Sequence, residues 1–100
     1  MNTSDESQLI TARFFLVIDN LINKRKLRGL KTFTDKYGIN YWNLSTVRKE
    51  PDRHFLRPEW LAILVRDYNV SATYLLTGVG LMFTDSRYTP KGSIKTPFKY

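Results

Sequence analysis

The chain has 100 residues, enough to build one hydrophobic core but not two separate domains. It has no cysteine, which excludes disulfides and thiolate metal sites and fits a reducing cytoplasm. No apolar run approaches the roughly 18 residues of a membrane span, and the polar, acidic start is not expected to be a signal peptide. We therefore expect a cytoplasmic protein without a membrane anchor.

The net charge of +7 is unevenly distributed along the chain. Residues 24 to 57 hold ten Lys or Arg against three acids, and the last fifteen residues hold four cations and no acid. A short basic run such as residues 24 to 28 is, by itself, more typical of a solvated surface. The larger excess over residues 24 to 57 favours a polyanionic partner.

The first predicted helix opens with a capping box, with Thr3 as the N-cap and Glu6 three residues further on. It extends to about Lys24, and Gly29 marks the exit from it. Apolar residues recur along it at three- and four-residue spacing and predict a broad core-facing stripe: Leu9, Ile10, Phe14, Val17, Ile18, Leu21 and Ile22.

Residues 30 to 49 (LKTFTDKYGINYWNLSTVRK) are interpreted as a helix, a tight turn and a second helix. Gly38 ends the first helix because it adopts positive φ at little cost, and Asn40 is a good N-cap for the second. The apolar residues Phe33, Tyr37, Ile39, Leu44 and Val47 can pack together between the two helices. The other face of the second helix is left mostly polar and basic.

The second half of the chain continues in the same way. Residues 50 to 57 form a loop because Pro51 cannot continue a helix. Pro58 begins the next helix, whose expected buried residues are Trp60, Leu61, Leu64, Val65 and Tyr68, with Asn69 as its stop. Ser71 can cap a short last helix that covers residues 72 to 77 and is closed by Gly78. Leu81, Met82 and Phe83 then fold back onto the core or form part of a dimer contact.

These motifs resemble a known family. Residues 30 to 49 resemble the helix-turn-helix unit of the lambda-repressor-like (Xre or Cro type) DNA-binding family, with the turn glycine at Gly38 and Thr34 where alanine is usual. Residues 70 to 83 (VSATYLLTGVGLMF) are similar to the "WLLTGEG-x-MF" ending of phage-repressor-like members, with Tyr74 for the tryptophan and Val79 for the glutamate. The resemblance spans residues 9 to 83. It implies an all-α fold, a compact bundle of about five helices over residues 1 to 83, followed by a basic, flexible or loosely docked tail over residues 84 to 100.

The resemblance further implies a sequence-specific transcriptional regulator, a repressor of phage or mobile-element type, that binds a palindromic double-stranded DNA operator as a homodimer. The residues expected to face base edges are Tyr41, Trp42, Asn43, Ser45, Thr46 and Lys49. Those expected to face phosphates are Lys31, Asn40, Arg48, Arg53, His54 and Arg57. Tyr41 and Trp42 are open to three interpretations: they pack on thymine methyl groups, stack on sugars, or cover the core.

Other functions have weaker support in the sequence. Catalysis and metal binding are not expected, because the carboxylates are scattered and His54 is the only histidine. Gly78 and Gly80 follow a helix and complete no nucleotide-binding fingerprint, so no cofactor is expected. The tail leaves no room for an autoprotease domain, and self-cleavage is not expected. The alternatives are a protein-interaction module, antitoxin-like or anti-repressor-like, that uses Tyr41 and Trp42, and an RNA-binding domain that uses the basic tail.

Overall fold

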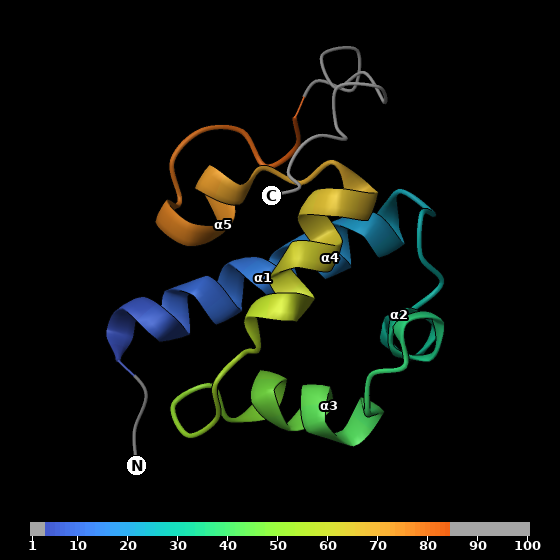
Figure 1. Cartoon of the computed structure of the whole chain (residues 1–100), viewed down its shortest axis with the longest axis horizontal. Coiled ribbons are helices and arrows are strands. Elements are labelled where there is room, and N and C mark those ends of the chain that lie inside the picture. Colours follow the sequence, from blue (N-terminus) through green and yellow to red (C-terminus); the bar gives the residue numbers. More distant parts are fainter. Residues whose placement is uncertain (1–3, 85–100) are drawn as a thin grey trace, which may run out of the picture.

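The computed structural model describes residues 4–84 and shows an all-α bundle, which confirms the predicted fold class (Figure 1). The helices of this part of the chain are α1 (Asp5–Asn23), α2 (Leu30–Tyr37), α3 (Tyr41–Lys49), α4 (Pro58–Tyr68) and α5 (Ala72–Thr77). In Figure 1, α1 crosses the middle of the molecule, with α5 above it and α3 below it. Apart from Thr84, the predicted tail lies outside the described residues.

The hydrophobic core forms around α1, which contributes the fully buried Phe14, Val17 and Ile18. Every other helix adds at least one buried side chain to the same cluster: Phe33 from α2, Leu44 and Val47 from α3, Trp60, Ile63 and Leu64 from α4, and Leu75 from α5. Burial of these large apolar groups is the main favourable term for so small a domain. One continuous core therefore holds all the described helices together.

The ends and the face of α1 differ in part from the prediction. The N-cap is Ser4, whose hydroxyl accepts a hydrogen bond from the Ser7 N–H at 3.1 Å, whereas Thr3 lies outside the described residues. Leu9 was expected in the core but is exposed. Phe15 is buried instead, because its ring packs edge-on against Phe14 with the centroids 5.0 Å apart.

A turn of three residues joins α2 to α3. Gly38 adopts the left-handed conformation with φ at 66°, and the Ile39 N–H donates to the Thr34 carbonyl at 2.9 Å. Thr34 is fully buried, and its hydroxyl donates to the Lys31 carbonyl at 3.0 Å, so the buried hydroxyl has a hydrogen-bond partner within α2. Figure 1 shows α2 end-on and α3 lengthwise, so the chain changes direction sharply at this turn.

Gly38→Ala is expected to lower the free energy of unfolding by about 1–2 kcal/mol. No atom lies within 4 Å of the position that a Cβ would take, so the loss comes from the positive φ alone. Gly38→Asn is the matched variant, and it should recover part of the loss because asparagine tolerates this conformation better. Urea unfolding of both variants measures the effect, and equal stability of Gly38→Ala and wild type would contradict it.

The buried face of α4 is rotated relative to the prediction. Trp60 and Leu64 are buried as expected, but Ile63 is also buried and Val65 is 37% exposed. Positions 60, 63 and 64 lie on one side of a helix, and position 65 lies well away from their midpoint. The predicted stop is confirmed, because Asn69 adopts the left-handed conformation with φ at 55°.

The segment after α5 returns to the end of α4. The Ser71 N–H donates to the Met82 carbonyl at 2.9 Å, and the Thr84 N–H donates to the Asn69 carbonyl at 2.8 Å. Met82 and Phe83 pack against the core, as predicted. Leu81 does not fold back onto the core and is 82% exposed, because it precedes the residues that these hydrogen bonds hold; its alternative role in a dimer contact stays a prediction.

Arg13 connects α1 to the C-terminal end of α5. Its guanidinium donates to the carbonyls of Leu75 at 2.9 Å and Leu76 at 3.2 Å. These carbonyls belong to the last turn of α5, where no further helical N–H follows to bind them. A cation at this position also complements the helix dipole, so Arg13 fixes a helix of only six residues on the bundle.

A polar cluster joins α2 to α4 at the surface. The Tyr37 hydroxyl donates to Asp67 Oδ2 at 2.7 Å, and Arg66 donates to both oxygens of the same carboxylate at 2.9 and 3.0 Å. The hydrogen bonds from Arg66, followed by the one from Tyr37, lower the pKa of Asp67. Burial, followed by hydrogen bonding to Tyr68 and Asp67, raises the pKa of Tyr37.

The stability that Asp67 contributes is expected to depend on pH. A lowered pKa in the folded state stabilises the protein above the ordinary carboxyl pKa, and this contribution disappears as pH falls through the lowered value. The difference in free energy of unfolding between wild type and Asp67→Asn should therefore be largest near neutral pH and shrink on acidification. Asp35→Asn, which breaks only the exposed pair with Lys31, should differ little from wild type at any pH. Urea unfolding from neutral to acidic pH tests both variants. A difference in free energy of unfolding between wild type and Asp67→Asn that does not change with pH would contradict the prediction.

Among the helices of residues 4–84, none is both long and apolar enough to cross a membrane.

Candidate nucleic-acid interface

The position of α3 follows from its cap and its apolar side chains. The Asn40 side chain accepts a hydrogen bond from the Asn43 N–H at 3.0 Å and so caps the helix, as predicted. Leu44 and Val47, three residues apart, are both buried against the bundle. Because one side of α3 is used in this way, the opposite side faces away from the core.

The outward side carries the residues that the sequence predicted to face base edges. Trp42, Asn43 and Lys49 are exposed, and Tyr41, Ser45 and Thr46 are half-buried. Trp42 is 71% exposed, so the option that it covers the core is wrong. The Thr46 hydroxyl donates to the Trp42 carbonyl at 2.8 Å within the helix.

Five of the six residues expected to face phosphates have partners within the protein, and the first three of them lie on α2, on α3 and in the turn between these helices. Arg48 donates to both carboxylate oxygens of Asp19 at 2.8 and 3.0 Å, and its guanidinium lies 5.1 Å from the centre of the Phe15 ring. Lys31 pairs with Asp35 at 3.0 Å, and the Asn40 side chain is the α3 cap. Arg48 thus braces α3 against α1, an interaction across 29 residues of sequence that no local pattern indicates.

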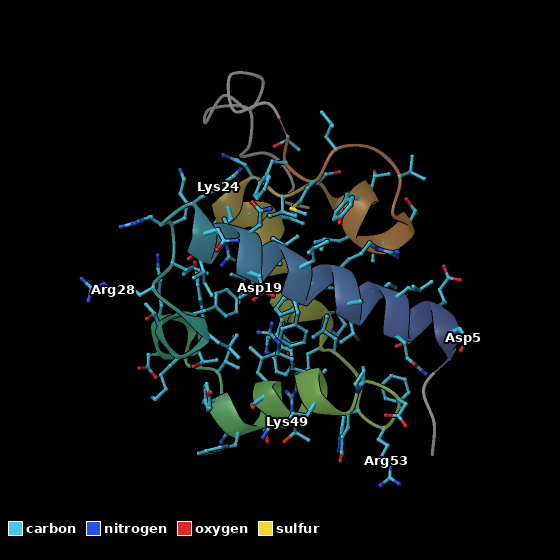
Figure 2. The ribbon with its side chains drawn as sticks, turned by 180° about the vertical axis from the view of Figure 1, so that it is seen from behind. Asp5, Asp19, Lys24, Arg28, Lys49 and Arg53 are labelled. Atoms are coloured by element: carbon cyan, nitrogen blue, oxygen red, sulfur yellow. The ribbon has the colours of Figure 1, made fainter. Side chains whose placement is uncertain are left out.

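The loop between α3 and α4 holds the other three residues that were expected to face phosphates. His54 pairs with Glu50 at 3.3 Å, and Arg57 pairs with Glu59 at 3.6 Å while lying 5.9 Å from the Trp60 ring centre. The Arg53 side chain has no ion-pair or hydrogen-bond partner among residues 4–84, and the same holds for Lys49. In Figure 2, Lys49 and Arg53 lie at the same edge of the molecule, and Lys24 lies at the opposite end.

Two hollows beside α3 bring several of the predicted residues together. The larger, of about 560 Å³, lies between the turn after α2 and α4, and Asn40, Asn43 and Arg57 line it. A smaller one, of about 220 Å³, is lined by Asn43, Thr46, His54 and Arg57 among others. Lys31 lines neither hollow and stands apart from this group on α2.

The structure also adds residues that sequence reasoning missed. Arg66 of α4 lines the larger hollow while it binds Asp67, and the exposed Phe55 lines the smaller one. Arg66 carried no specific signal, because a cation in the last turn of a helix is expected on helix-dipole grounds alone. Phe55 carried no signal, because an aromatic residue in a loop is as compatible with burial as with exposure.

The described residues contain no group of three His, Cys, Asp or Glu side chains placed to hold a metal ion. Their buried side-chain nitrogen and oxygen atoms all have hydrogen-bond partners. What these residues define is a five-helix all-α bundle with one short helix whose outward side is exposed and partly basic. Comparison of the chain with protein-family models, with curated proteins and with solved structures found no match in any of the three.

Proposed function

We propose that the protein is a sequence-specific regulator of transcription that binds double-stranded DNA through a helix-turn-helix formed by α2 and α3. One observation carries the proposal: α3 buries Leu44 and Val47 and leaves Trp42 and Lys49 exposed on its other side. A short helix with an exposed outward side matches the width of the major groove, where side chains meet distinct donor and acceptor patterns on the bases.

The charge around α3 supports the same proposal. Lys49 ends the helix, and Arg53 follows in the loop with no acidic partner among the described residues. The segment from 48 to 57, which holds both residues, carries four Lys or Arg against two acids. Cations of this kind position a protein on the phosphate backbone, while the outward side of α3 would read base edges. Binding at an operator would then block transcription by occupancy.

A single α3 offers few base contacts, so we further propose that the protein binds as a homodimer to a palindromic operator of two half-sites. The two half-sites would lie about one helical turn, roughly 34–36 Å, apart. Sedimentation of the protein on its preferred duplex is expected to give two protomers per duplex. One protomer per duplex would contradict the dimer and leave the proposal of DNA binding intact.

The main test is selection of bound duplexes from a random DNA library, followed by the salt dependence of affinity for the preferred sequence. We expect a palindromic consensus and a steep fall of affinity with salt, because binding releases counterions from the phosphates. Absence of any enriched sequence would contradict the proposal. Competition by single-stranded RNA would point instead to an RNA-binding domain.

The exposure of Trp42 favours a second function, a protein-interaction module of antitoxin or anti-repressor type. Trp42 packs edge-to-face on Tyr41 with the ring centroids 5.2 Å apart, and exposed aromatic pairs are frequent anchors of protein interfaces. This function predicts a purified partner whose affinity falls on Trp42→Ala and changes little with salt. It also predicts that no DNA sequence is enriched from the library.

A further inference from the structure

The most exposed aromatic side chain of α3 has a defined setting. Trp42 is the second residue of the helix and is 71% exposed, although most tryptophan side chains are largely buried. The Tyr41 ring meets it at an interplanar angle of 81°, so the two rings pack edge to face. Trp42 and Lys49 are seven residues apart and therefore lie on the same side of α3.

The Trp42 side chain is itself mainly apolar. An indole has one N–H donor and no acceptor. The Thr46 hydroxyl donates its proton to the Trp42 carbonyl, so Thr46 has no further proton to donate to a ligand. The other branch of the Thr46 side chain is an apolar methyl group. The nearest cation on this side of the helix is Lys49, two turns further on. In the N-terminal half of α3 the large exposed apolar group is thus the Trp42 ring, among uncharged side chains, and the C-terminal end of the helix presents charge.

We propose that Trp42 determines specificity by packing against the C5-methyl group of a thymine in the major groove. The inference rests on the proposed function, DNA binding through α3. The thymine methyl is the only apolar group that the base pairs display in the major groove. N-terminal residues of a recognition helix are the ones that contact base edges, and Trp42 holds such a position. An apolar ring that covers this methyl group removes apolar surface from water, which favours binding. A ring without a hydrogen-bond acceptor cannot accept from a cytosine amino group, so cytosine at this position would add little to the binding free energy.

The test uses duplexes in which deoxyuridine replaces each thymidine of the preferred sequence, one at a time. This replacement removes only the methyl group and keeps base pairing. For the wild-type protein we expect one position in each half-site at which the replacement weakens binding about fourfold, the value for loss of one buried methyl-sized group. Trp42→Ala should bind the thymine duplex more weakly and no longer distinguish thymine from uracil at that position.

Two further variants complete the experiment. Trp42→Phe keeps an apolar ring and should retain part of the preference for thymine. Leu76→Ala removes a side chain that is 47% exposed on α5, which lies on the other side of α1 from α3, and should behave as wild type (Figure 1). Thermal unfolding of each variant checks that it is folded, which we expect because Trp42 and Leu76 lie outside the core.

The possible outcomes separate this inference from the proposed function. Sequence-specific binding in which wild type and Trp42→Ala respond equally to every uracil replacement would overturn the role of Trp42 alone. A preferred sequence without thymine in its half-sites would do the same. Failure to enrich any DNA sequence would overturn the proposed function, and the role of Trp42 with it.

Discussion

Replacing Phe33 with alanine is expected to lower the free energy of unfolding by about 3–5 kcal/mol. The Phe33 side chain is fully buried, and its ring centre lies 6.2 Å from that of Phe14, 5.3 Å from that of Tyr37 and 6.4 Å from that of Tyr68. Its removal opens a cavity where α1, α2 and α4 meet, in addition to the loss of apolar burial. Small domains are stable by only about 5–15 kcal/mol, so this variant should be close to unfolding. Urea unfolding at neutral pH measures the loss.

Phe55→Ala is the matched control for this prediction. It removes the same ring from the loop before α4, where Phe55 is 57% exposed and belongs to no core cluster. We expect its free energy of unfolding to stay within about 0.5 kcal/mol of wild type. Equal losses for Phe33→Ala and Phe55→Ala would contradict the placement of Phe33 in the core.

Lys49→Ala and Arg53→Ala are expected to weaken DNA binding in different ways, if the proposed function is correct. Lys49 ends the outward side of α3, and its replacement should reduce discrimination at one base-pair position by about 1–3 kcal/mol. Arg53 lies in the loop, and its replacement should weaken all duplexes alike and reduce the slope of log affinity against log salt by about 0.9. Affinities for preferred and random duplexes at several salt concentrations separate the two effects.

Lys24→Ala is the control, because Lys24 lies at the opposite end of the molecule, 4.0 Å from the centre of the Phe83 ring (Figure 2). It removes one positive charge, as the other two variants do, so a general charge effect would appear in all three. We expect Lys24→Ala to keep the discrimination of wild type and nearly all of its salt slope. A loss in Lys24→Ala equal to that in Arg53→Ala would show that net charge, not the surface at α3, governs binding.

The helices themselves were largely predictable from local sequence. Capping and stop residues act on their own neighbours, and Gly38, Asn40, Asn69, Ser71 and Gly78 all have the predicted roles. The spacing of Leu44 and Val47 also correctly indicated the buried side of α3. The residue patterns that determine helix ends extend over only three or four positions, so one sequence contains them completely.

The candidate interface was predictable only in part. Sequence placed Lys49, Arg48 and Arg53 in one basic group, but the structure separates them, because Asp19 of α1 binds Arg48 and leaves the other two without partners among residues 4–84. An ion pair between residues 29 positions apart depends on how two helices cross, and no local pattern encodes that. That Lys49 and Arg53 contact DNA stays a prediction, to which the structure adds that neither side chain has a partner among residues 4–84.

By itself, the sequence determined that this protein is helical, where most of its helices begin and end, and which side of α3 is buried. These features follow from backbone preferences and from apolar spacing within single helices. Only the tertiary structure decided which side chains at the margins are buried: Phe15 and Ile63 are inside, and Leu9, Val65 and Leu81 are outside. The physical reason is that apolar stripes are wider than the contacts between helices, so the packing of neighbouring elements selects which of their residues lose water.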